Sequence, residues 1–167
     1  MRVAHIPRNN TSSVASIIPA LRELDVDARG WQFRYERSLI TTDDNVAFVQ
    51  LPGPREYGIA FNAVARFTGI VAWADVIHWY CSAPGILPRA LDKNVLRLLR
   101  KPGVVEWRGS DIRSPDVELA DNPIFRAHWE AHPEDLSPHA DRVRSRERQE
   151  FFAELGFGTV VPPGMAQ

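Results

Sequence analysis

A six-residue segment that begins at Arg108 holds the side chains best suited to chemistry, and it reads Arg-Gly-Ser-Asp-Ile-Arg. Gly109 allows a sharp turn and the close approach of a ligand. Arg108 and Arg113 carry planar guanidinium groups that suit phosphate or carboxylate. Asp111, a carboxylate between two arginines, is expected to remain ionised at neutral pH and so to serve as a base or to bind hydroxyls. The alternative is an Asx-type turn in which Ser110 and Asp111 hydrogen-bond local amides, and local chemistry alone favours that structural role.

Two further polar features lie earlier in the chain. Arg8, Asn9 and Asn10 form a polar loop directly after Pro7. His78 stands inside a nearly continuous apolar run. A histidine in such a run is more often a hydrogen-bonded core residue than a catalyst, although near the carboxyl end of a strand it would face a ligand.

Alternating strands and helices must position these residues. The apolar pattern predicts strands at Arg2–Ile6, Val26–Phe33, Val46–Val49, Asp75–Cys81, Val104–Trp107 and Thr159–Val161. Helical patterns occupy Ser13–Leu24, Tyr57–Trp73, Leu87–Leu99, Asn122–Ala131 and a stretch capped by Ser137 and closed by Leu155-Gly156. In the second helix the spacing places Phe61, Val64, Ala65, Thr68 and Val71 on one face. The alternation predicts an α/β class: a Rossmann-like three-layer domain with a mostly parallel sheet.

Ligands of such sheets collect at the carboxyl ends of the strands. The order of elements brings three loops to that edge: Pro7–Thr11, Ser82–Gly85 and Arg108–Pro115. We therefore expect the candidate residues to lie at one edge of the sheet.

Length and composition narrow the class of protein. The 167 residues suffice for one domain, residues 1–167, and 44% of them are hydrophobic, as in a folded globular chain. The net charge of −1 favours neither nucleic acid nor a membrane surface as a partner. The single cysteine, Cys81, rules out an internal disulfide and is expected in the core. The first residues predict a strand rather than a signal peptide, so we expect a cytoplasmic protein.

Three histidines lie near one another in the sequence and are candidate metal ligands. His128 and His132 are four residues apart, with His139 nearby, but Pro133 argues against a helix that continues past them. No cysteine or closely spaced carboxylate completes a site, so we predict no metal. The chain has neither a P-loop nor a G-x-G-x-x-G motif.

Four alternating arginines mark the last predicted helix: Arg142, Arg144, Arg146 and Arg148. Their alternation spreads them around the helix, which favours a solvated surface with ion pairs to Glu147 or Glu150. Peripheral contact with an anionic membrane is the alternative.

Several segments, in their order, resemble the N-terminal domain of bacterial family 4 glycosyltransferases, which have the GT-B fold. They are Leu21–Ala28 (Leu-Arg-Glu-Leu-Asp-Val-Asp-Ala), Ala74–Tyr80 (Ala-Asp-Val-Ile-His-Trp-Tyr), Gly109–Arg113 (Gly-Ser-Asp-Ile-Arg) and Phe151–Phe157. The resemblance covers most of the chain. It implies transfer of a sugar from a nucleotide-sugar donor to a saccharide or lipid-linked acceptor, with retention and without a cofactor, as in polysaccharide biosynthesis.

The resemblance also implies roles for the candidate residues. Asp111 and Arg108 would be catalytic, with Arg108 on donor phosphate or acceptor. Substrate would be bound by Arg8, Asn9, Asn10, His78, Gly109, Ser110 and Arg113. Many members have histidine beside the donor sugar where this chain has Arg108, which leaves Asp111 as the best polar candidate. Many also have glycines where this chain has Pro7–Asn10.

A GT-B enzyme has two Rossmann-like domains, and the second holds most donor contacts. We therefore expect this chain to be the acceptor-side half, without the donor-binding C-terminal domain. It would be a domain fragment, a truncated gene product, or one half of a split enzyme whose partner chain supplies that domain. The alternative is a non-catalytic binding or interaction module, or a relic, that has kept the fold. A receiver-like signalling domain is a weaker alternative, because acidic residues would be expected where Arg8 and Asn9 stand.

Overall fold

The computed structural model describes residues 1–7, 13–33, 46–49, 57–80, 85–107, 119–133 and 142–161. The strands in these ranges are β1 (Arg2–Ile6), β2 (Asp27–Gln32), β3 (Val46–Phe48), β4 (Val76–Tyr80), β5 (Gly103–Glu106) and β6 (Gly158–Val160). The helices are α1 (Ser13–Glu23), α2 (Tyr57–Trp73), α3 (Leu91–Leu99), α5 (Pro123–Ala131) and α6 (Arg142–Glu154), with a 3₁₀ turn at Pro88–Ala90.

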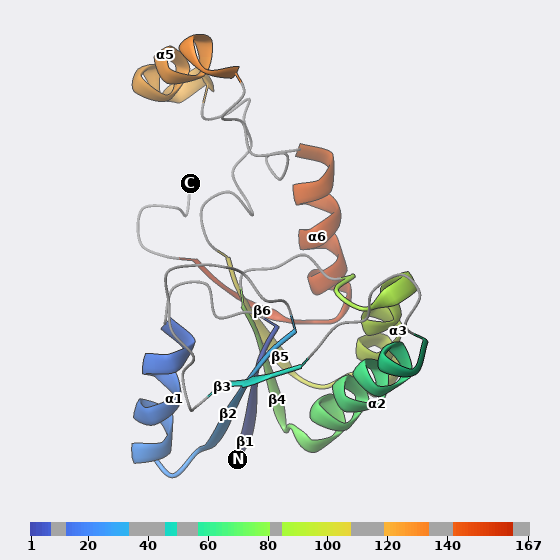
Figure 1. Cartoon of the computed structure of the whole chain (residues 1–167). Coiled ribbons are helices and arrows are strands. Elements are labelled where there is room, and N and C mark those ends of the chain that lie inside the picture. The colour runs from blue at the N-terminus through green and yellow to red at the C-terminus, as the bar shows by residue number, and fades with distance from the viewer. Residues whose placement is uncertain are drawn as a thin grey trace.

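The strands form a single sheet in the order β3-β2-β1-β4-β5-β6, and every neighbouring pair is parallel. Helices cover both faces (Figure 1): α1 lies on one face, and α2, α3 and α6 lie on the other. The predicted Rossmann-like three-layer α/β fold is therefore confirmed. Each predicted strand is present within one or two residues of its expected bounds, and α2 has the predicted bounds.

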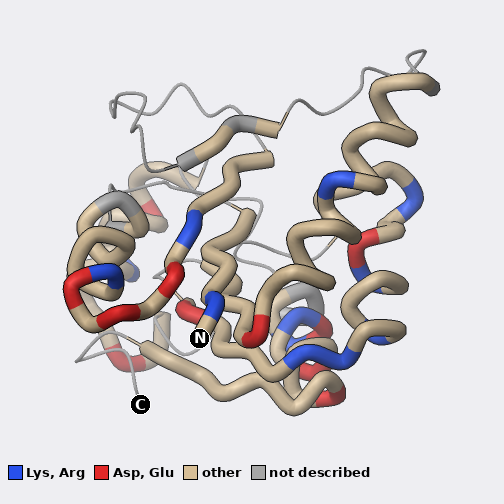
Figure 2. The backbone as a smooth tube through the Cα atoms, turned by 90° about the horizontal axis from the view of Figure 1, so that it is seen from below, with Lys and Arg blue, Asp and Glu red and all other residues tan. Residues whose placement is uncertain are grey.

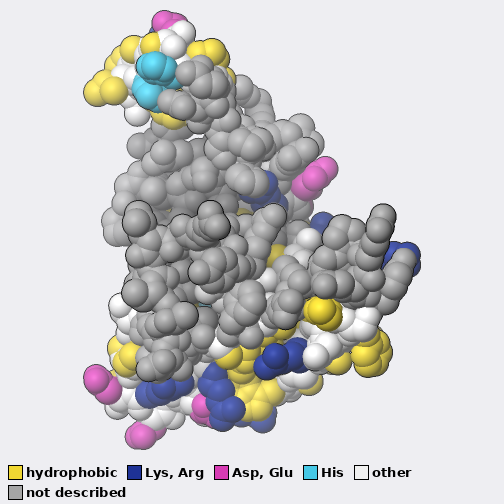
Figure 3. Space-filling view, viewed as in Figure 1, with side chains coloured by type: hydrophobic (Ala, Val, Ile, Leu, Met, Phe, Trp, Pro, Cys, Tyr) yellow, Lys and Arg dark blue, Asp and Glu magenta, His cyan; other side chains and the backbone are white. Residues whose placement is uncertain are grey.

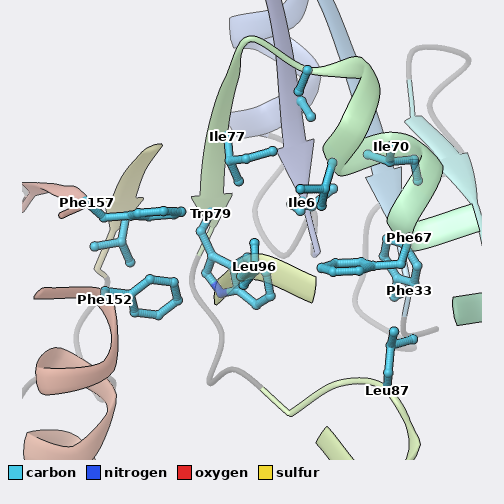
Figure 4. Close-up of a cluster of buried hydrophobic side chains, with 14 of the residues drawn as sticks. Ile6, Phe33, Phe67, Ile70, Ile77, Trp79, Leu87, Leu96, Phe152 and Phe157 are labelled. Carbon is cyan, nitrogen blue, oxygen red and sulfur yellow. The ribbon is translucent and has the colours of Figure 1, made fainter. Parts of the chain in front are cut away.

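The larger core lies between the sheet and α2, α3 and α6, and Trp79 is at its centre (Figure 4). The Trp79 ring contacts Phe67 of α2 and Phe152 of α6, with centroid distances of 6.4 and 5.5 Å. Because β4 is buried on both faces, its sequence is a continuous apolar run rather than an alternating one. The smaller core, under α1, joins Val14 and Ile18 to the opposite side of the sheet.

The buried face of α2 matches the predicted one only in part. Val71 is fully buried and Val64 packs against the core, as predicted. Phe61 is instead 78% exposed, and Ala63, Phe67 and Ile70 face the core. The helix is apolar around most of its circumference, so the spacing of apolar residues alone does not select a face. Packing against Phe33 selects it instead, through a ring contact with Phe67 at 5.5 Å.

Arg2 and Asp75 join the amino ends of the two central strands, β1 and β4. The Arg2 backbone N–H donates to the Asp75 carboxylate at 2.8 Å, and the guanidinium donates at 2.6 Å. These hydrogen bonds from Arg2 lower the pKa of Asp75 to about 2. The contact fixes the register in which β1 lies beside β4.

Hydrogen bonds and a ring contact fix the described residues next to each of the three predicted loops. Phe33 donates its N–H to the carbonyl of Pro7 at 2.9 Å, next to the end of β1. Trp107 donates its N–H to the carbonyl of Val160 and packs its ring on Phe152 at 5.6 Å. The buried Asp92 carboxylate accepts from the backbone N–H groups of three successive residues, Gly85, Ile86 and Leu87, at 2.6, 3.2 and 3.3 Å.

Charged residues of both signs are mixed over the described part of the chain, whereas exposed apolar groups are prominent on α5 (Figures 2 and 3). Figure 2 shows Lys and Arg interspersed with Asp and Glu rather than gathered on one side. Helix α5 projects from the body and presents apolar and histidine side chains, and Ile124 is 81% exposed (Figures 1 and 3). None of the described helices is both long enough and apolar enough to cross a bilayer.

Candidate functional site

The sheet has a topological switch point between β1 and β4. The chain leaves β1 for one half of the sheet, which holds β2 and β3, and it leaves β4 for the other half, which holds β5 and β6. Helix α1, which follows β1, and helix α3, which follows β4, lie on opposite faces of the sheet (Figure 1). In open parallel sheets this arrangement places a ligand crevice at the carboxyl ends of the two central strands. This edge is where a ligand of an open parallel sheet is expected.

Two histidines meet at the switch point. His5 of β1 and His78 of β4 are register partners. Their Nδ1 atoms are 2.8 Å apart, and their ring centroids are 4.8 Å apart in an edge-to-face arrangement. Side chains alternate along a strand, so His5 shares its face with Val3, and His78 shares the same face with Tyr80. That is the face covered by α1.

A carboxylate extends the histidine pair across a third strand. The Glu106 Oε2 atom, in the last residue of β5, lies 3.3 Å from His78 Nε2. The His78 and Glu106 side chains are only 15% and 11% exposed. We call His5, His78 and Glu106 the histidine–glutamate chain. It links the carboxyl halves of β1, β4 and β5, the three strands that precede the predicted loops.

Burial determines the protonation of both rings. It lowers the pKa of His5 to about 3, with a smaller contribution from the charge of His78. The pKa of His78 is also lowered, chiefly by burial, although Glu106 opposes the shift through its charge and hydrogen bond. Both rings are therefore neutral at physiological pH, and each has one N–H donor and one nitrogen acceptor.

The carboxylate then fixes the direction of the hydrogen bonds. An ionised carboxylate only accepts, so His78 Nε2 carries the proton and His78 Nδ1 is an acceptor. His5 Nδ1 must therefore donate to His78 Nδ1. This leaves His5 Nε2 as an acceptor, and it is buried without a hydrogen-bond partner among the described residues. Such a chain can relay a proton from a group at His5 Nε2 to Glu106 in two steps. The first step passes a proton from His5 to His78, and the second passes one from His78 to Glu106.

Of the residues predicted to form the site, His78 is the one that the structure describes. It is a hydrogen-bonded, largely buried residue, as expected, and it lies at the switch point. The other predicted site residues fall outside the described ranges: Arg8, Asn9, Asn10, Arg108, Gly109, Ser110, Asp111 and Arg113. Cys81 lies outside them as well.

Sequence reasoning missed His5 and Glu106. Each is a polar residue in a short apolar strand, next to last in β1 for His5 and last in β5 for Glu106. That placement was the available signal. It becomes specific only when the strand order is known, because β1 and β4 are separated by 73 residues at the histidine contact.

The other histidines do not form a metal cluster in the described part of the chain. His128 of α5 and His132, the residue just after that helix, are both exposed, with ring centroids 5.2 Å apart. The helix ends at Ala131, as Pro133 suggested. No group of three or more His, Cys, Asp or Glu residues that could hold a metal occurs in the described ranges.

The basic run of α6 is partly an ion-paired surface. Arg146 donates to Glu150 at 2.8 Å, one turn further along, which is one of the predicted pairings. Arg148 is 8% exposed and thus faces inward. The side chains of Arg142 and Arg144 lie outside the described part.

Comparison with other proteins adds no relative. No protein-family model, no curated protein and no solved structure matches the chain. The fold, the switch point and the residues around it are therefore the basis for assigning a function.

Proposed function

We propose that the chain is the acceptor-side domain of a GT-B glycosyltransferase. One observation carries the proposal: the strand order β3-β2-β1-β4-β5-β6 makes β1, β4 and β5 adjacent. The three predicted loops follow these three strands in sequence, so all three begin at the switch-point edge, and the loops after β1 and β5 carry the candidate side chains. The order of the similar segments along the chain supports the same assignment.

Hydrogen bonds of the backbone next to each predicted loop also support the proposal. Functional loops work best when a rigid scaffold positions them. One fixed point lies next to each loop: Pro7, Trp107, and the turn at Gly85–Leu87 that hydrogen-bonds to Asp92. Side chains on three anchored loops could converge on one saccharide.

In this proposal the chemistry is divided between residues and domains. Arg8, Asn9 and Asn10 hold acceptor hydroxyls, and Asp111 and Arg113 line the cleft. Arg108 balances the charge of the donor phosphates, whose release leaves an oxocarbenium-like sugar. Most donor contacts come from a second Rossmann-like domain, in the same protein or in a partner chain.

Ligand binding by the chain itself tests this division. Saturation-transfer NMR should detect neutral saccharides but little binding of UDP-, GDP- or ADP-sugars. Tight nucleotide-sugar binding by this chain alone would overturn the division of labour. Saccharide binding without transfer, when a donor-binding domain is also present, would instead support the binding-module alternative.

The complete enzyme allows a sharper test with matched variants. Asp111→Ala should lower turnover on the order of 100-fold, as for loss of one preorganised polar group. Asp121→Ala, at an exposed position, is the matched control and should leave turnover unchanged. Near-normal turnover of Asp111→Ala would remove this residue from the site.

A further inference from the structure

The histidine–glutamate chain ends in an atom that needs a partner. His5 is 1% exposed, and its Nε2 atom has no hydrogen-bond partner among the described residues. Buried polar atoms in folded proteins are nearly always paired, with protein, with ordered water or with a ligand. An orphan acceptor at a topological switch point therefore indicates a missing donor.

The direction of the chain defines the chemistry of that donor. Because Glu106 fixes His78 Nε2 as a donor, His5 Nε2 presents a lone pair and cannot itself donate. The partner must carry an N–H or O–H group. A cation would bury a further charge on the face of the sheet where apolar Val3 and Val14 pack, whereas a neutral hydroxyl would not.

We propose that His5 Nε2 accepts a hydrogen bond from a hydroxyl group bound at the switch point between β1 and β4. The hydroxyl belongs either to a buried water or to the saccharide acceptor. The saccharide source rests on the proposed function, whereas the water source does not. In both cases Glu106 and His78 are positioning residues, because they act by fixing the tautomer of His5.

The groups that face His5 on this side of the sheet are consistent with this role. Among the described residues they are His78 and Tyr80 of β4, Glu106 of β5, and the apolar side chains of α1. Burial keeps the pKa of His5 far below neutrality, so the lone pair remains available throughout the physiological range.

Long-range ¹H–¹⁵N spectra of the full chain, labelled with ¹⁵N-histidine, test the proposal at neutral pH. His5 should be the Nδ1–H tautomer and His78 the Nε2–H tautomer. The His5 Nε2 signal should lie upfield of a free lone pair before any sugar is added if water is bound. If the saccharide is the source, the signal should move upfield and saturate as neutral mono- and disaccharides are titrated.

The spectra can also overturn the proposal. A protonated His5 Nε2 would reverse the direction of the chain. An Nε2 signal at the free lone-pair position that no saccharide moves would leave the acceptor without a donor. His5→Gln assigns the signal by its loss, with His128→Gln as the matched control, and backbone correlations assign it if His5→Gln does not fold.

The outcome is separable from that of the proposed function. If His5 binds water and the protein transfers no sugar, this inference is supported and the proposed glycosyltransferase function is rejected. Measured transfer by a protein whose His5 Nε2 is protonated would do the reverse.

Discussion

At the scale of single residues, the buried histidines make the stability of the protein depend on pH. The pKa of His5 falls from 6.5 to about 3 on folding, and that of His78 is lowered as well. The unfolded chain therefore binds protons more readily than the folded one below pH 6.5. Stability is fully present above that value and is lost as the pH falls toward 3.

Urea unfolding should reveal this dependence. The free energy of unfolding should fall by roughly 1.4 kcal/mol per pH unit for each such histidine as the pH drops below its unfolded pKa. The exposed His128 and His132 serve as controls, and replacing both with Asn should leave the slope unchanged. A flat profile from neutral pH to about pH 4 would mean that His5 and His78 are not buried as neutral rings.

Asp92 offers a second residue-scale prediction. Its carboxylate is fully buried and accepts from three backbone N–H groups. Asp92→Asn keeps the shape but replaces one acceptor oxygen with a donor, so we expect a loss of about 2–3 kcal/mol in unfolding free energy.

Asp25→Asn is the matched control for the Asp92 variant. Asp25 is exposed and has φ 57°, a conformation that Asn also tolerates. The control should change the unfolding free energy by less than about 0.5 kcal/mol. Equal effects of the two variants would show that the backbone contacts of Asp92 contribute little.

At the scale of elements, two glycines give opposite predictions. A Cβ atom on Gly103, at the start of β5, would lie 2.4 Å from the Phe157 ring, whereas one on Gly69 in α2 meets nothing within 4 Å. Gly103→Ala should therefore cost about 1–3 kcal/mol through overpacking. Gly69→Ala should stabilise the protein by roughly 0.5–1 kcal/mol through helix propensity. Thermal unfolding of both variants measures the contrast, and a stabilising Gly103→Ala would contradict the packing of Phe157 on β5.

The elements also show how far sequence reasoning reached. Strands such as β4 and helices such as α2 were predictable, because apolar runs and helical spacing are local signals. The buried face of α2 was predictable only in part, since apolar residues surround the helix and tertiary packing chooses among them. The contact between His5 and His78 depends on strand order and register across 73 residues, which no local pattern encodes. The predicted loop edge was consistent with the strand order, but the residues expected there, Asp111 among them, lie outside the described ranges.

At the scale of the whole molecule, the switch point divides the sheet along the chain. Residues up to Phe48 build β1, β2 and β3, and residues from Val76 onward build β4, β5 and β6. The two half-sheets meet through the pairing of β1 with β4, which the Arg2–Asp75 contact and the two histidines reinforce. Helix α2 also packs against α3 across this boundary.

This division makes the protein a candidate for fragment complementation. Two polypeptides separated between Ala74 and Asp75 would each carry one contiguous half-sheet, and we expect them to reassemble when co-expressed. The paired imidazole signals of His5 and His78 would appear only on reassembly, as a spectroscopic marker of the joined halves. A cut after Arg100 would instead separate β4 from β5 and should reassemble less well. If the fragment pairs from both cuts reassembled equally well, the switch point would not be a boundary between two separately folding halves.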